Sequence, residues 1–254
     1  MLIRSWSGRK LFGTMHLLPE SYAAKLKEVV RPLVERCTSL VLECDLPPLG
    51  YEPPHARLPK GERLEALVPA GLYSSIVEAG DAQGLSADDI STSSPWWAAE
   101  RLGLATIRAL GLSGKNSVES AAREHAQAMG RRVEFLENLD RGYISRSQAP
   151  LSEQLWLLES VVRRPEENRA ELIEMVRAFA SGTAEAWEKI LVDGSSHQPE
   201  TTDDLFRRRN LEWLPSIESE LERGRPLVVI GALHLVGANG ILALLRDHGF
   251  RLER

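Results

Sequence analysis

Two stretches, LFGTMHLLP at residues 11–19 and VIGALHLVG at residues 229–237, decide the fold of this chain. In both, an apolar run leads into Gly-x-x-His, which we call a GxxH unit. The glycines Gly13 and Gly231 permit tight backbone conformations where a strand ends. We therefore predict two strand–loop–helix units whose histidines, His16 and His234, project from the carboxyl edge of one sheet.

Two further apolar runs, SLVLECD at residues 39–45 and RVEFLE at residues 132–137, are predicted strands that end in carboxylates. Glu43 closes the first and Glu137 the second. Helical patterns separate all of these strands along the chain. Strands that alternate with helices are typical of α/β proteins. We predict an α/β fold with a central mixed, largely parallel sheet flanked by helices.

Two helical segments, at about residues 46–116 and 140–225, are too long to be simple crossovers between neighbouring strands. We expect them to be helical insertions that cap the active-site edge of the sheet. The chain has 254 residues, a length that suits one large domain or two small ones. The prediction is a single α/β domain over residues 1–254.

Composition excludes several classes of protein. Apolar residues make up 43% of the chain and charged residues 26%, as in an ordinary globular protein. The net charge of −5 is not that of a typical nucleic-acid-binding protein, which carries an excess of basic residues. The most apolar stretch, residues 226–245, is interrupted by His234 and by glycines, so no membrane span is expected. The first ten residues lack the apolar core of a signal peptide, and we expect a cytoplasmic protein.

The expected meeting of His16, Glu43 and His234 at one sheet edge is the main indication of an active site. In open α/β sheets, ligands bind beyond the carboxyl ends of the strands. Imidazole and carboxylate groups can hold a divalent metal such as Mn, Co or Zn with positions open to water. Without a metal, a Glu–His pair can take a proton from water and return it to a leaving group. The residue pattern leaves both chemistries open, and a purely structural strand-end histidine as well.

A basic cluster, Arg207 to Asn210, lies in a predicted helix over residues 202–223. Aspartates four residues earlier are suitable partners for Arg207 and Arg208 on the helix face. Arg209 and Asn210 have no such partners. We expect these two to face the cleft and hold a substrate carbonyl or carboxylate, with a solvated helix face as the alternative.

Taken in order, six segments resemble the TraB/GumN family, which includes the TIKI proteases. They are LFGTMHLLPE, LVLECDL, SPWWAAERL, RVEFLEN, RRRN and VVIGALHLVGANGILALLRDHGF. The resemblance implies an α/β fold related to erythromycin esterases and to ChaN-like haem-binding lipoproteins. It also implies a metal-dependent peptidase activity, with manganese or cobalt proposed for the TIKI branch.

By position, the resemblance implies that His16, Glu43 and His234 form the catalytic and metal-binding set. Arg209, Asn210 and Glu137 are then expected to support substrate binding. The leading hypothesis is a divalent-metal-dependent hydrolase acting on peptides. The alternatives are a metal-free esterase or amidase of a small molecule, and a protein that binds a peptide or small ligand without turnover. The sequence leaves the oligomeric state open, a homo-oligomer included.

Overall fold

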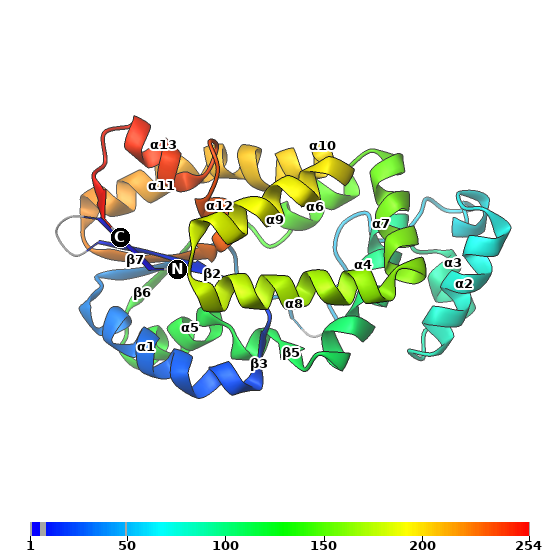
Figure 1. Ribbon diagram of the computed structural model, residues 1–254, viewed down its shortest axis with the longest axis horizontal. Helices are drawn as coiled ribbons and strands as arrows, with labels where there is room; N and C mark the ends of the chain where they lie inside the picture. The colour runs from blue at the N-terminus through cyan, green and yellow to red at the C-terminus, as the bar shows by residue number, and fades with distance from the viewer. Residues whose placement is uncertain (1, 6–8, 49, 254) are drawn as a thin grey trace.

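The computed structural model, which describes residues 2–5, 9–48 and 50–253, contains a six-stranded sheet that lies toward the left of Figure 1. Its strand order is β6-β4-β7-β2-β1-β8. The strands are β1 (Leu2–Ser5), β2 (Lys10–Thr14), β4 (Ser39–Leu42), β6 (Arg132–Phe135), β7 (Pro226–Gly231) and β8 (Leu252–Glu253). A second, two-stranded sheet pairs β3 (Leu18–Pro19) with β5 (Leu112–Ser113).

The four strands β6, β4, β7 and β2 run parallel, while β1 is antiparallel to both of its neighbours. Leu227 of β7 faces Leu40 of β4, and Val228 of β7 faces Leu11 of β2. Every residue of β4 and β7 is buried, as expected for parallel strands covered on both faces. The predicted mixed, largely parallel sheet is confirmed.

Helices cover both faces of this sheet (Figure 1). On one face lie α1 (Ala23–Arg36) and α5 (Val118–Ala128), and on the other lie α11 (Arg209–Arg223) and α13 (Ile241–Asp247). Gly130 takes the left-handed conformation (φ 61°) just beyond α5, as glycines commonly do where a helix ends. The main core lies between these layers.

The long segments between the strands are helical. The first carries α2 (Ala70–Asp81), α3 (Ala87–Ser91) and α4 (Pro95–Ala109), with short 3-10 turns at Leu64–Ala66 and Gly114–Asn116. The second carries α6 (Arg141–Ser147), α7 (Leu151–Arg163), α8 (Pro165–Ser181), α9 (Ala184–His197) and α10 (Pro199–Thr202). Helices α2, α3, α4 and α7 extend away from the sheet on the right of Figure 1. They share a second core that includes Leu72, Ile76, Ala99, Leu102 and Leu158.

Two predicted strands are shorter than expected, because β4 ends at Leu42 and β6 ends at Phe135. Past those ends the backbone turns: the N–H groups of Leu136 and Glu137 both donate to the carbonyl of Glu43. The two predicted carboxylates therefore lie just beyond the strands, on connected loops. Within the described residues, no helix is both long and apolar enough to cross a membrane.

Candidate active site

The predicted site residues follow neighbouring parallel strands. Glu43 comes directly after β4 and Glu137 two residues after β6. His16 lies two residues after β2, and His234 lies in the short helix α12 (Ala232–Leu235) that follows β7. Because parallel strands present their carboxyl ends at one edge, the fold brings these four residues together as the sequence predicts.

The glycines of the two GxxH units have different surroundings. A Cβ placed on Gly13 would lie 2.8 Å from Cδ1 of Leu235, so this glycine permits close packing of β2 against α12. A Cβ on Gly231 would instead lie 3.2 Å from Oε1 of Glu43 and 3.5 Å from Nε2 of His16. The missing side chain of Gly231 therefore leaves space where the functional groups converge.

The two histidines also differ in exposure. The side chain of His16 is 59% exposed, whereas His234 is only 3% exposed. The ring of His234 packs against Trp213, with ring centres 4.3 Å apart, and meets the edge of Phe206 at 5.1 Å. Although the two units are similar in sequence, the imidazole of His16 faces solvent and that of His234 lies in the core.

The Glu43 carboxylate is buried and fully engaged. Its Oε1 accepts the backbone N–H of Gly231 at 2.5 Å, and its Oε2 accepts Nη2 of Arg209 at 3.2 Å. Nε2 of His16 lies 3.6 Å from Oε1. The carboxylate is therefore fixed between a backbone donor, a guanidinium and an imidazole.

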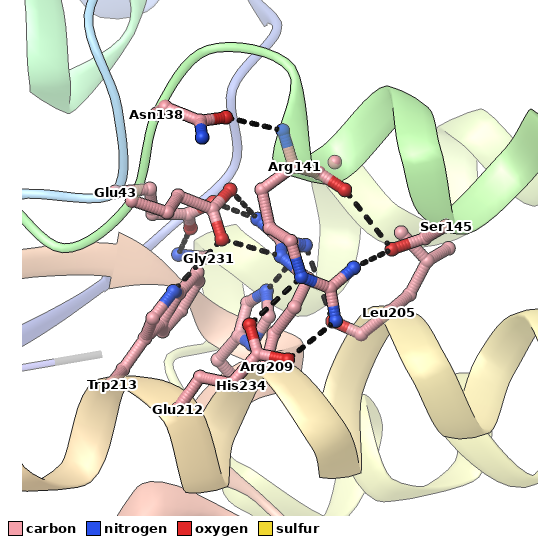
Figure 2. A network of polar contacts seen from close by, with 12 residues as sticks. Glu43, Asn138, Arg141, Ser145, Leu205, Arg209, Glu212, Trp213, Gly231 and His234 are labelled. Carbon is pink, nitrogen blue, oxygen red and sulfur yellow. Dashed lines mark hydrogen bonds and ion pairs between the residues drawn. The ribbon is translucent and has the colours of Figure 1, made fainter.

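Arg209 is the centre of the buried network (Figure 2). Its Nε and Nη2 donate hydrogen bonds to the two carboxylate oxygens of Glu137, at 2.9 and 2.7 Å, and form a bidentate pair. The second hydrogen on Nη2 is donated to Glu43. Nη1 donates to the carbonyl of Leu205 at 3.2 Å, and it also lies 3.4 Å from Nε2 of His234. A guanidinium has five N–H donors. Each one has a protein partner here.

A π-helical stretch, Asp203–Arg208, lies between α10 and α11 and leads directly into Arg209. Arg141 of α6 ties this region together, with Nη1 2.8 Å from Asp204 and Nε 2.8 Å from Glu212 (Figure 2). Widened helical turns of this kind are frequent at functional sites. Here the turn brings the Leu205 carbonyl within reach of the guanidinium.

Asn210 determines the tautomer of His234. Its Nδ2 donates to the carbonyls of His234, at 3.1 Å, and Asn239, at 2.8 Å. Carbonyls only accept hydrogen bonds, so the amide orientation is fixed and Oδ1 faces Nδ1 of His234 at 2.7 Å. Nδ1 therefore carries the proton in the neutral ring, and Nε2 is the acceptor that faces Arg209.

His16 has a second carboxylate on its other side. Its Nδ1 lies 2.6 Å from Oε1 of Glu119, a residue in the first turn of α5. The other oxygen of Glu119 accepts the hydroxyl of Thr14 at 2.9 Å. The exposed imidazole thus stands between Glu119 and Glu43.

These contacts shift the pKa values of three side chains. Desolvation lowers the pKa of His16, but Glu43 and Glu119 outweigh it and raise that pKa to about 9. Burial alone would raise the pKa of Glu43, yet His16, His234 and Arg209 lower it to about 2. Burial dominates for His234, and with Arg209 nearby its pKa falls to about 3. At neutral pH the site holds an imidazolium, a carboxylate and a neutral imidazole.

A cavity of about 520 Å³ opens onto one side of this cluster. His16, Glu43, Glu119, Glu137 and Arg209 line its charged end. Its apolar walls include Leu17, Leu42, Leu46, Pro47, Leu139 and Tyr143, and four further charged residues, Asp45, Glu100, Arg123 and Arg146, also line it. Asn210 and His234 are not among the lining residues. Small-molecule sites are commonly of this size and have this mixture of apolar walls and a few polar groups.

The predicted metal ligands are close together but are not arranged as a ligand set. Among the described residues, no group of three or more His, Cys, Asp or Glu side chains is placed to hold a metal ion. The reason is local: the lone pair on Nε2 of His234 faces Nη1 of Arg209, a cation. The donor set His16, Glu43 and His234 therefore does not fit a three-ligand centre in this arrangement.

The predicted substrate-binding residues, Arg209, Asn210 and Glu137, all lie in the network. Arg209 and Glu137 reach the cavity wall, but their polar atoms bind each other, and Trp213 adds an indole N–H to Glu137 at 2.8 Å. Sequence reasoning missed Glu119. A serine N-cap followed by an acidic residue in the first turn, as Ser117 and Glu119 are, is common to many helices, so no sequence signal marked it.

The chain is similar to a known protein family and to curated proteins from two bacteria. A family model described as the TraB/PrgY/gumN family matches residues 3–254. Proteins from Escherichia coli (strain K12) and Shigella flexneri, each described as "Uncharacterized protein YbaP", are 24% identical to this chain over 236 residues. Each alignment covers 93% of this chain and 87% of the relative. No solved structure matches the chain.

Proposed function

Because this chain belongs to the TraB/PrgY/gumN family and carries the cluster described above, we propose that it is a hydrolase of ester or amide bonds in small acyl compounds or short peptides. The observation that carries the proposal is the exposed His16 ring held between Glu119 and Glu43 at the charged end of the cavity. An imidazolium can give up a proton and an ionised carboxylate can accept one, so the pair holds the two groups that general acid–base catalysis uses.

The charge states assign a role to each partner. Glu43, ionised at neutral pH, accepts a proton from a water molecule as the water oxygen attacks the substrate carbonyl. His16, protonated at neutral pH, gives its Nε2 proton to the departing oxygen or nitrogen as the acyl bond breaks. The proton on Glu43 then returns to Nε2 of His16, 3.6 Å away, which restores the starting state.

The remaining network acts through Glu43 in this scheme. The Gly231 N–H and Arg209 hold the carboxylate in place and in its charged form. Asn210 accepts the Nδ1 proton of His234, which leaves Nε2 of His234 free to accept a hydrogen bond from Nη1 of Arg209. The apolar walls of the cavity favour a substrate with an apolar group beside its carbonyl.

The test is a screen for cleavage by protein freed of metal with a chelator. Chromogenic esters and a mixture of short peptides are incubated with wild type, with His16→Gln and with Glu43→Gln, and the products are read by absorbance and mass spectrometry. Loss of general acid–base catalysis lowers rates by about 10²- to 10⁴-fold. The exposed His248, paired with Glu218 at 2.6 Å, supplies the control variant His248→Gln.

Cleavage that survives chelation and is lost in both site variants supports the proposal. Full activity in His16→Gln, or recovery of every compound unchanged by the wild type, overturns it. The second result would favour a protein that binds a peptide or small ligand without turnover.

The second candidate is the metal-dependent peptidase expected from the sequence. The space in front of Gly231 favours it, because Oε1 of Glu43 and Nε2 of His16 both border that space. In the same screen, activity that is absent after chelation and restored by Mn, Co or Zn would select this candidate. His234 then has to leave Arg209 to act as a ligand, so His234→Gln would abolish the restoration.

A further inference from the structure

We propose that Glu119 is the positioning residue of His16: it holds the ring through Nδ1 so that Nε2 faces Glu43 and the cavity. The contact geometry stands by itself, and only its consequence for catalysis rests on the proposed hydrolase. Glu119 lies 103 residues from His16 in the chain and belongs to a helix on one face of the sheet.

Both oxygens of Glu119 are engaged at the end of β2. Oε1 receives Nδ1 of His16 at 2.6 Å, and Oε2 receives the hydroxyl of Thr14 at 2.9 Å. Thr14 is the last residue of β2 and is only 1% exposed, so it is a rigid anchor. The carboxylate therefore bridges a fixed strand end and a solvent-exposed ring, and this bridge restrains the ring.

The start of helix α5 suits a carboxylate in this role. The N-cap Ser117 accepts the N–H of Ser120 at 3.2 Å, which orders the first turn that carries Glu119. Negative charge is favoured at a helix N-terminus. The Glu119 side chain is 15% exposed and reaches the wall of the cavity.

Comparison of the two GxxH units shows what the partner of Nδ1 decides. Nδ1 of His16 meets a carboxylate, whereas Nδ1 of His234 meets the neutral amide of Asn210. A carboxylate partner fixes the ring orientation and favours the imidazolium, while an amide fixes the orientation alone. Glu43 and Arg209 are the other charged groups near His16, and Arg209 opposes the imidazolium. Glu119 is thus the group that distinguishes the exposed histidine.

The experiment is ¹⁵N-resolved NMR of the histidine rings in the full chain, with no substrate or metal added. The wild type is expected to show a strongly deshielded Nδ1–H signal from His16, because the bond to Glu119 is short and charge-assisted. Glu119→Ala is expected to lose this signal, and Glu119→Gln, which keeps a neutral acceptor, is expected to shift it upfield. The matched control is Glu124→Gln on the same helix, where Glu124 pairs with Lys27 at 2.8 Å.

An unchanged His16 signal in folded Glu119→Ala overturns the proposal. If Glu119→Ala fails to fold, Glu119→Gln decides: an unshifted signal there overturns it equally. Where a cleaved substrate has been found, kcat is expected to fall about 10- to 100-fold in Glu119→Ala, with partial rescue in Glu119→Gln and KM little changed. Because the NMR result needs no substrate, a positive signal with no detectable hydrolysis would contradict the hydrolase while the positioning role stands.

Discussion

Nη1 of Arg209 lies 3.4 Å from Nε2 of His234, so a buried cation is the neighbour of the acceptor nitrogen in the second GxxH unit. This contact is one difference between the surroundings of two motifs that are similar in sequence. The first histidine faces the cavity between two carboxylates, and the second supports the guanidinium that holds Glu43 and Glu137. The sequence predicts that both histidines project from the carboxyl edge of the sheet; in the fold the ring of His16 is exposed and the ring of His234 is buried.

Removing the charge of Arg209 is expected to destabilise the protein strongly. Arg209→Gln leaves the buried carboxylates of Glu43 and Glu137 without their cation, a change that costs about 3–5 kcal/mol of unfolding free energy. Urea denaturation measures the loss. The control is the neighbouring Arg208→Gln, which removes a half-exposed charge and is expected to change stability by no more than about 0.5 kcal/mol. Equal effects in the two variants would contradict the central role of Arg209.

Gly231→Ala is expected to abolish activity while leaving the fold intact. The backbone at Gly231 (φ −54°, ψ 137°) suits alanine, so the only crowding comes from the new Cβ, 3.2 Å from Oε1 of Glu43. The new methyl group fills the space beside Oε1 of Glu43 and Nε2 of His16. Rates on the substrate found in the screen should fall at least about 10²-fold, as for loss of the acid–base pair. Gly71→Ala, in open space on α2, is the control and should keep full activity.

Gly13→Ala is expected to act on stability instead. The added methyl group would lie 2.8 Å from Cδ1 of Leu235 and 3.2 Å from Cα of Ala232, within the packed contact between β2 and α12. Overpacking of this kind costs about 1–3 kcal/mol. Thermal and urea unfolding measure it. A Gly13→Ala protein as stable as the wild type would contradict the role of Gly13 in the close packing of β2 against α12.

Much of the site could be predicted because strand ends leave a strong signal in sequence. The apolar runs before His16, Glu43 and Glu137 fix which residues reach the carboxyl edge, and parallel pairing then brings them together. The lack of helix-face partners for Arg209 likewise indicated a special position. Its neighbours behave as expected, with Arg207 paired to Asp203 at 2.5 Å.

The remainder depends on contacts between segments far apart in the chain. The burial of His234 is produced by packing against Trp213 and Phe206, and the motif around it gives no hint of that packing. Glu119 reaches His16 only because α5 packs against β4, β6 and β7, which brings its first turn to the end of β2. The engagement of every Arg209 donor could not be predicted either, since its partners come from separate elements.

The pH dependence of stability tests the buried charge states most directly. The pKa of His234 falls from 6.5 to about 3 on folding, so between these values the unfolded chain binds a proton that the folded chain does not. Stability is therefore expected to decrease as pH is lowered from 6.5 toward 3. Glu43, with its pKa lowered from 4.5 to about 2, adds a loss in the same direction below pH 4.5. His16 acts oppositely, because its raised pKa gives stability below pH 6.5 that is lost as pH rises through 9.

Taken together, the three pKa shifts predict that the stability contributed by the cluster is highest near pH 6.5. One variant tests the loss of stability expected below that pH. His234→Asn removes the titrating ring, so the slope of unfolding free energy against pH between 4 and 6.5 should become shallower, whatever the absolute stability. His248→Asn, an exposed histidine paired with Glu218, is the matched control. Urea denaturation at several pH values gives the slope. If His234→Asn keeps the wild-type slope, the folded protein does not hold His234 neutral, and the hydrogen-bond assignment through Asn210 and Arg209 is wrong.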